Sequence, residues 1–372
     1  MRFFHLTSSS LAASLLLYLP RLASCQGGEF TLSCLPLTYQ RSDPILFPGV
    51  VSPHTHVVVG GTNFNRTMSE DLAPNAQNTT CSVNIDRSNY WQPLLYHLNS
   101  DGTFEAIPFQ GNVCVFLPCA IIAEWSFTVF FCRRQAVYYL NRACNYTAGA
   151  TSCPTNGSYP LAPPAGLRMV AGNPMLRTYN DSNFAQRAMS HMCLTETDSI
   201  YTNSLPSQPC LRLRAQTFFP SCWDGKNLDS PDHTSHMSYP AIGDYNTGVC
   251  PESHPVAIFS IFLEFFYDVS NYTDYENWVY AMGDPTGYGL HADFVNGWTD
   301  IDALQNAFAT CTGPQGENDP GCSITGGHVQ GATTQQDAFP APAEDLGLTA
   351  PIPALPGNNP VTGSASDRQT SS

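Results

Sequence analysis

Positive charge is scarce in this chain of 372 residues. Only 15 residues are lysine or arginine, whereas 30 are aspartate or glutamate, and the formal net charge is -15. A surface with this excess of negative charge repels nucleic acid and anionic lipid, so neither is an expected partner. The sequence also contains no G-x-G-x-x-G dinucleotide motif, no P-loop, no G-x-S-x-G nucleophile elbow and no H-E-x-x-H zinc motif. These absences disfavour nucleotide chemistry and acyl transfer.

The apolar run near the start of the chain is too short to span a bilayer. About 20 apolar residues are needed, but the largely apolar run near the start covers only Leu11–Leu19. Arg2 precedes this run and Ala23-Ser24-Cys25 follows it, which is the order of a secretory signal peptide over residues 1–25. No lipid-anchor signal is visible. We therefore expect a secreted, extracellular monomer, and six glycosylation sequons fit this expectation: Asn65, Asn78, Asn145, Asn156, Asn180 and Asn271.

Cysteine is plentiful, but the C-x-x-C pairs typical of zinc sites are missing. The sequence holds 14 cysteines, and in a secreted chain these are predicted to form disulfides. Cys25 leaves with the signal peptide, and three more cysteines lie in the unusual segment 113–135. The remaining ten form an even set that allows up to five bridges: Cys34, Cys81, Cys144, Cys153, Cys193, Cys210, Cys222, Cys250, Cys311 and Cys322.

Composition divides the mature chain into a folded unit and a tail. Residues 26–312 are predicted to form a single domain, and the run Pro255–Asp268 is rich in the β-branched and aromatic residues of a central strand. We expect a mainly β fold, sandwich or jelly-roll-like, with long loops, few short helices and disulfide staples. Residues 313–372 are rich in proline, glycine and serine, which predicts a disordered C-terminal tail.

Segment 113–135 is strongly apolar and does not resemble its surroundings. Pro118 and Glu124 disfavour a transmembrane helix, and a buried pair of strands is an alternative. We interpret the segment as a retained intron that is translated in frame. Every valine codon begins with GT and Gln135 can be encoded by CAG, so the segment can start and end with splice signals.

Groups that can perform chemistry are concentrated between Cys222 and Pro240. Prolines, a glycine and turn-forming residues interrupt any helical or strand period, so this stretch is predicted to be an ordered loop. Charge clustered on a loop of a stapled domain favours a functional site, although aspartates that cap turns would give the same composition. The groups are Asp224, Asp229, Asp232, His233 and His236.

A second candidate lies on a short predicted strand that ends at Gly60-Gly61. Side chains alternate along a strand, so His54 and His56 should point to the same side, with Cα atoms about 7 Å apart. Two imidazoles placed in this way can ligate one metal ion or flank one substrate. Local hydrogen bonding beside the glycine-rich turn is the alternative.

Five motifs stand out along the chain: DPILFPGVVSPHTHVVVGG, SNYWQPLLY, CWDGKNLDSPDHTSHMSYP, GVCPESHPV and GDPTGYGLHADFVNGWTDIDALQNAFATC. Their order and spacing over residues 30–311 resemble those of the secreted fungal family DUF1996, a domain of unknown function. The resemblance implies a fungal source and secretion, but no reaction. In the family pattern the strand AVYYL follows the preceding turn almost directly, which supports the intron interpretation.

The first functional hypothesis is a carbohydrate-active hydrolase or lyase that acts on cell-wall or plant polysaccharide. A glycosidase needs two carboxyl groups about 5 to 9 Å apart, and a lyase needs a histidine or tyrosine base. Candidate catalytic residues are Asp224, Asp232, His236, Asp284, His291 and Asp293, with Glu264 as a candidate buried acid. Candidate sugar-binding residues are Trp91, Tyr239 and Trp298.

Two alternatives remain open. A metal site could use His54, His56, His233 and His236, whose imidazole nitrogens suit zinc or copper. A copper site built on an amino-terminal histidine is not expected, because the predicted first residue is Gln26. The other alternative is a non-enzymatic cell-wall protein that binds glycan through its aromatic residues.

Overall fold

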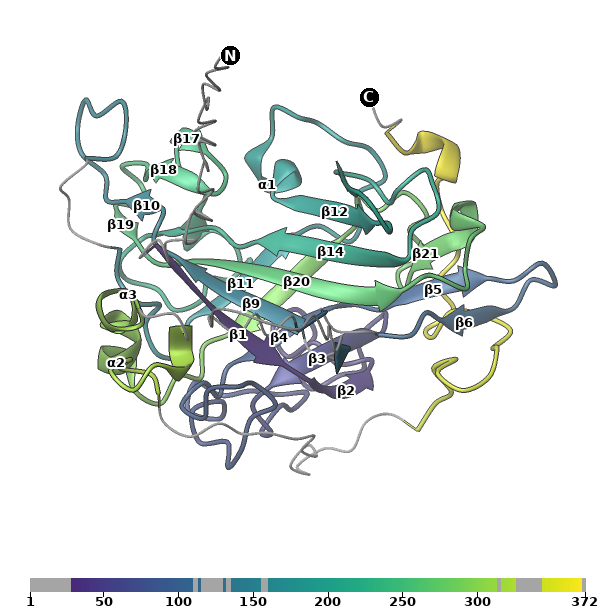
Figure 1. The fold of residues 1–372 in the computed structure, drawn as a ribbon, viewed down its shortest axis with the longest axis horizontal. Helices are drawn as coiled ribbons and strands as arrows, with labels where there is room; N and C mark the ends of the chain where they lie inside the picture. The colour runs from purple at the N-terminus through teal and green to yellow at the C-terminus, as the bar shows by residue number, and fades with distance from the viewer. Residues whose placement is uncertain are drawn as a thin grey trace, which may run out of the picture.

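The computed structural model describes residues 28–109, 113–114, 130–131, 135–154, 160–312, 316–325 and 343–369. Two antiparallel sheets dominate this part of the chain (Figure 1). The six-stranded sheet has the order β1 (Glu29–Cys34), β9 (Gln135–Leu140), β20 (Ser260–Asp268), β14 (Arg212–Phe218), β12 (Met189–Leu194) and β13 (Ser199–Thr202). The five-stranded sheet has the order β11 (Arg168–Gly172), β22 (His291–Val295), β4 (Asn89–Pro93), β3 (His56–Gly60) and β2 (Pro36–Gln40).

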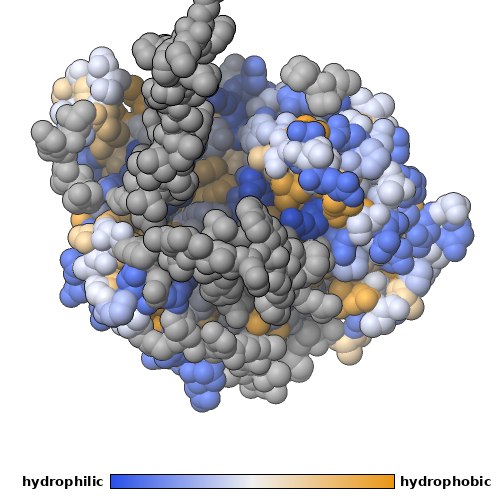
Figure 2. Space-filling model, in the orientation of Figure 1, coloured by the Kyte–Doolittle hydropathy of each residue, from blue (hydrophilic) through white to orange (hydrophobic). Residues whose placement is uncertain are grey.

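The remaining elements are short and lie around these sheets. Three three-stranded sheets contain β10 (Ala143–Cys144), β18 (Thr247–Val249) and β17 (Ile242–Asp244); β16 (Met237–Ser238), β15 (Cys222–Trp223) and β19 (Val256–Ala257); and β21 (Trp278–Tyr280), β5 (Leu95–Leu98) and β6 (Phe104–Ala106). The helices described are α1 (Phe184–Arg187), α2 (Ile301–Gln305), α3 (Ala307–Thr310) and the 3-10 turns Tyr275–Asn277, Gly316–Asn318 and Ala365–Asp367. Hairpin β5–β6 projects from the body and is hydrophilic at its tip (Figures 1 and 2). The prediction of a mainly β fold with few short helices is confirmed.

The main core lies between the two large sheets. Val57 and Val59 of β3, together with Phe294 of β22, face the six-stranded sheet and are fully buried there. Polar tips of buried aromatic residues need partners, and the hydroxyls of Tyr90 and Tyr139 meet at 2.8 Å across the core. The prediction of a sandwich-like fold therefore holds at the level of packing.

The opposite face of the five-stranded sheet carries a second, smaller core. Side chains alternate along β3 and β4, so Val58 and Trp91 point away from the main core and pack with Val295, Ile45 and Phe64. The covering residues come from two connections: Ile45 from the one between β2 and β3, and Phe64 from the one between β3 and β4. Apolar residues fill only part of this face. Polar side chains occupy the rest of it, at the first residues of β3 and β22.

Five disulfides join the ten cysteines that were predicted to pair. Within the described residues the bridges are Cys34–Cys81, Cys144–Cys153, Cys193–Cys210, Cys222–Cys250 and Cys311–Cys322. Bridges of this number are typical of proteins that fold in an oxidising compartment. Among the described residues, no helix combines the length and the apolar character that a membrane crossing requires.

Residues 343–369 were expected to belong to a disordered tail, but they pack on the domain. Ile352 and Leu355 are buried in the main core. Arg368 is also buried and donates hydrogen bonds to four backbone carbonyls. A proline-rich composition lowers the apolar content of this segment, but a few well-spaced apolar side chains and one arginine suffice to attach it.

The retained-intron prediction falls almost entirely outside the described residues. Of segment 113–135, the structure describes β7 (Val113–Cys114), which pairs with β8 (Phe130–Phe131), and Gln135 at the start of β9. The signal peptide also lies outside the described part of the chain.

Candidate metal centre

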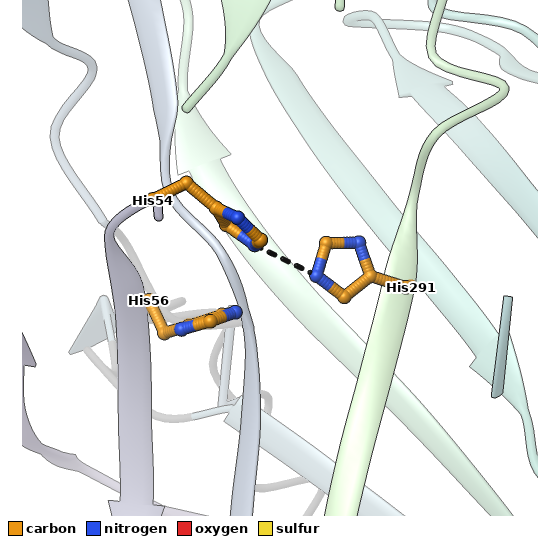
Figure 3. A group of neighbouring side chains, drawn as sticks. All are labelled: His54, His56 and His291. Atoms are coloured by element: carbon orange, nitrogen blue, oxygen red, sulfur yellow. Dashed lines mark hydrogen bonds between the residues drawn. The ribbon is translucent and has the colours of Figure 1, made fainter. Parts of the chain in front are cut away.

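Three histidines converge on the outer face of the five-stranded sheet. His56 is the first residue of β3, His54 lies just before it, and His291 is the first residue of β22. In the sheet order β4 lies between β22 and β3, so side chains on one face of the two strands meet over β4 (Figure 3). The Nε2 atoms of His54 and His291 are 2.9 Å apart. The ring centroid of His56 lies 4.4 Å from that of His54 and 5.7 Å from that of His291.

Backbone carbonyls fix the tautomers of two of these imidazoles. Nδ1 of His56 lies 3.1 Å from the Ser42 carbonyl, and Nδ1 of His291 lies 2.9 Å from the Gly289 carbonyl. A carbonyl oxygen only accepts, so each Nδ1 carries the proton and each Nε2 keeps a lone pair. Nε2 of His56 is buried and has no hydrogen-bond partner. Histidines that ligate a metal show this arrangement of the outer nitrogen.

Two carboxylates stand next to the imidazoles. Asp293 is on the same face of β22 as His291, and both of its oxygens are buried without a hydrogen-bond partner. One oxygen of Asp43 accepts from the backbone N–H groups of Ile45 and Leu46, each at 3.0 Å. Within the described residues, neither carboxylate forms an ion pair with an arginine or lysine.

The five side chains form two overlapping groups with metal-ligand spacing. His54, His56 and His291 each offer a ligand atom within 4.8 Å of the others, and Asp43, His56 and Asp293 do the same. His56 belongs to both groups. His54, His291, Asp43 and Asp293 therefore each have a ligand atom within 4.8 Å of one on His56.

Burial favours the neutral forms of these groups when no cation is bound. Burial lowers the pKa of His54 and His56 well below the usual histidine value, and it lowers the pKa of His291 to about 4. The same burial raises the pKa of Asp43 to about 6 and the pKa of Asp293 well above its usual value. Desolvation penalises the charged form in each case.

Glycine makes room for His291 at the edge of the sheet. Gly172 of β11 pairs with His291 and has a φ of +86°. A Cβ atom at Gly172 would lie 2.4 Å from the Leu290 carbonyl oxygen and 2.8 Å from the Cα of His291. The close approach of β11 to β22 at this position therefore requires glycine.

The structure brings some of the predicted residues together and separates others. His54 and His56, predicted as metal ligands, lie beside His291 and Asp293, which were predicted as catalytic residues. His233 and His236, predicted as metal ligands, belong to neither ligand group. His233 bonds the Asp229 carboxylate at 2.9 Å, and His236 contacts the Arg168 carbonyl at 2.7 Å.

The aspartates of the Cys222–Pro240 loop form turns. Asp224 accepts from the N–H groups of Lys226 and Asn227, and Asp232 accepts from those of Thr234 and Ser235. These are the side-chain-to-backbone bonds that make aspartate common in turns. The alternative interpretation of this loop, turn-capping aspartates, accounts for both residues.

The other predicted residues have structural contacts. Asp284 is buried and accepts from the N–H groups of Thr286 and Gly289. Trp91 and Trp298 are buried in the two cores and do not present a surface for sugar stacking. The Tyr239 hydroxyl donates to the Phe218 carbonyl at 2.8 Å. Glu264 is buried and forms an ion pair with Arg214 at 2.8 Å.

Sequence reasoning missed Asp43. It opens the same motif that contains His54 and His56, but it is separated from them by a proline-rich turn. The available signal was its place at the start of that motif, one proline-rich turn before the predicted histidine strand. Its Asx-type turn, closed by the N–H groups of Ile45 and Leu46, is what brings the carboxylate back to the site.

We expect Asp224→Ala to leave metal affinity unchanged. The substitution removes the acceptor that closes the turn over Lys226 and Asn227, so it should lower the free energy of unfolding by about 1 kcal/mol. Isothermal titration with zinc and chemical denaturation measure the two quantities. A loss of zinc binding in this variant would show that the loop contributes to the metal site.

Comparison with known proteins gives a family without an assigned activity. The model of the family described as domain of unknown function DUF1996 matches residues 43–298. No curated protein and no solved structure matches the chain. All five side chains of the candidate centre lie inside the matched region, with Asp43 at its first position. The chain therefore belongs to the DUF1996 family.

Proposed function

We propose that this protein binds a divalent transition-metal ion through His54, His56 and His291, with Asp293 and Asp43 completing the set of ligands. Imidazole nitrogen and carboxylate oxygen are ligands that zinc accepts, and a nitrogen-rich set also suits copper. Calcium and magnesium, which prefer oxygen ligands alone, are disfavoured by the three imidazoles.

The unpaired carboxylate of Asp293 carries this proposal. A buried carboxylate without a hydrogen bond or a cation is costly, and the protein instead keeps it protonated or pairs it with a positive charge. Here the neighbouring groups are Asp43 and neutral imidazoles whose lone pairs point inward. A divalent cation would satisfy the lone pairs and both carboxylates at once.

The residues of the chain have separate roles in this proposal. The Ser42 and Gly289 carbonyls orient the imidazoles of His56 and His291, and the second core beside Trp91 excludes water from one side of the site. A bound ion would supply Lewis-acid chemistry, and copper would add redox chemistry. Asp43, with one oxygen held by backbone N–H groups, can accept a proton beside the centre.

Action on a cell-wall or plant polysaccharide stays a prediction. The two loop aspartates close turns, and the candidate sugar-stacking residues Trp91 and Trp298 are buried. A hydrolase or lyase built on the Cys222–Pro240 loop, and a glycan-binding protein that uses these tryptophans, therefore gain no support from this geometry. Five disulfides support an oxidising compartment as the place where the protein works.

The proposal predicts one metal ion per chain. The purified protein is stripped with a chelator, dialysed separately against zinc, copper, manganese and calcium, and its metal content is measured by mass spectrometry. Zinc or copper should be retained at one equivalent. At an ion concentration 100 times the Kd, binding should raise the free energy of unfolding by about 2.7 kcal/mol. Failure to retain any transition metal would reject the proposal.

A further inference from the structure

We propose that the C-terminal segment, residues 343–369, is a clamp that holds the ligand-bearing stretches of the metal centre in place. This inference rests on the proposed function. The five ligands come from the connection around residues 43–56 and from the strand at 291–293. The C-terminal segment contacts the chain directly beside both. Three contacts carry the argument.

The first contact fixes the start of the connection that carries Asp43. Nε of Arg41 donates to both carboxylate oxygens of Glu344 at 2.9 Å, and each side chain of this ion pair is 21% exposed. Nη1 of Arg41 donates to the Ser52 carbonyl at 3.1 Å. Arg41 therefore ties the two ends of the 41–52 connection together while Glu344 holds Arg41. The next residue, Ser42, provides the carbonyl that orients His56.

The second contact lies next to His54. The side-chain amide of Asn359 donates to the carbonyls of Pro53, Ala281 and Pro356 at 2.9, 3.1 and 2.9 Å. Gly357 approaches the same Pro53 carbonyl so closely that a Cβ atom would lie 2.1 Å from its oxygen. The residue before His54 is thus bonded to the clamp from one side and packed against it from the other.

The third contact reaches His291 through a short chain of hydrogen bonds. Thr362 donates its backbone N–H to the Gly283 carbonyl at 2.9 Å, and Arg368 donates to the Pro285 carbonyl at 2.7 Å. Between these anchors, Asp284 accepts from the Gly289 N–H at 2.7 Å. The Gly289 carbonyl in turn accepts from Nδ1 of His291.

These contacts join the clamp to the residues that hold three ligands: Arg41 beside the Ser42 carbonyl bonded to His56, Pro53 beside His54, and the turn that ends in the Gly289 carbonyl bonded to His291. Loss of a direct outer partner typically lowers metal affinity by about 10- to 100-fold, and the clamp residues act by holding such partners in place. Arg41, Glu344 and Asn359 are positioning residues in this scheme, because none of them belongs to the ligand groups. The connection 41–53 has no regular strand of its own, so its position depends on such tertiary bonds.

The test uses point variants in the full chain. Glu344→Gln removes the ion pair with Arg41, and Asn359→Ala removes the amide whose two hydrogens serve the Pro53, Ala281 and Pro356 carbonyls. Asp244→Asn is the matched control, because Asp244 forms an ion pair with Arg187 at 2.9 Å outside the clamp. Zinc and copper affinities are measured by titration, and the ligand-field spectrum of the copper form reports the geometry of the ligands. Hydrogen exchange of amides in 41–55 is measured on the metal-free protein.

We expect Glu344→Gln and Asn359→Ala to weaken metal binding by about 10- to 100-fold, to shift the copper spectrum and to speed exchange in 41–55, while Asp244→Asn changes none of these. Faster exchange in all three variants, or wild-type affinity and spectrum in both clamp variants, would overturn the inference. If wild-type protein binds no metal, the proposed function fails. The exchange data then decide by themselves whether the segment holds the connection, and unchanged exchange overturns the clamp as well.

Discussion

Replacing His56 with alanine will abolish detectable binding of zinc and copper. His56 is the one side chain that belongs to both ligand groups, and its Nε2 is a buried lone pair without a hydrogen-bond partner. Without it, His54 and His291 are separated from Asp43 and Asp293 by an empty position. Metal content after dialysis and the metal-induced rise in Tm measure the effect.

His191→Ala is the matched control for this loss. His191, on β12 of the six-stranded sheet, is as buried as His56. Its Nε2 bonds the Tyr280 hydroxyl at 2.9 Å. Its removal should destabilise the fold and leave the stoichiometry of the folded fraction at one ion per chain. Wild-type metal affinity in His56→Ala would show that the ion binds elsewhere.

Asp293→Asn will change metal affinity and metal-free stability in opposite directions. Loss of a direct carboxylate ligand should lower metal affinity more than loss of an outer partner does, which typically lowers it by about 10- to 100-fold. In the metal-free protein the same change removes a buried carboxylate whose two oxygens lack partners. We expect the free energy of unfolding at pH 7 to rise by about 1 to 3 kcal/mol. Chemical denaturation with and without zinc measures both effects.

The stability gain should depend on pH with a defined sign. Burial raises the pKa of Asp293 well above the usual 3.8, so the folded state holds a proton that the unfolded chain releases. Wild-type stability then falls as pH rises above about 4, by at most about 1.4 kcal/mol per pH unit. Asparagine has no such dependence, so the advantage of Asp293→Asn should vanish below pH 4. An equal advantage at pH 3.5 and pH 7 would contradict this account.

Comparing the wild type with Asp293→Asn separates the pH dependence of stability due to Asp293 from that due to the three histidines. Their pKa values are lowered by burial, so the unfolded chain binds protons that the folded protein does not. Their contribution to stability is therefore lost as pH falls below about 6.5. Because His54, His56 and His291 are present in both proteins, the difference between the two stability curves reports mainly on Asp293.

Local patterns predicted the parts of the site that lie close together in the sequence. Alternation along a strand placed His54 and His56 on one side, and the structure has them adjacent. The chemistry of His291 and Asp293 made them candidates, but their partner could not be deduced. His54 and His291 are 237 residues apart in the chain, and only the order β22–β4–β3 brings them together. Sheet order depends on long-range packing that no local pattern records.

For two expectations based on composition, the structure shows specific contacts that composition does not reveal. Dense charge in the Cys222–Pro240 loop favoured a site, but Asp224 and Asp232 use their oxygens to close turns. Proline and glycine in the C-terminal region predicted disorder, but Ile352 and Arg368 find partners on the domain. In both cases a few specific bonds decide the conformation, and average composition does not contain them.

The 237-residue separation between His54 and His291 also sets an order of events during biosynthesis. The site cannot assemble until β22 has been synthesised, because β22 follows all other strands of the two large sheets. Until β22 joins the five-stranded sheet, the chain offers only Asp43, His54 and His56. Binding through the complete set of ligands is thus a late step. The Cys34–Cys81 bridge, which encloses Asp43, His54 and His56, can keep these three early ligands close to one another until the late ones arrive.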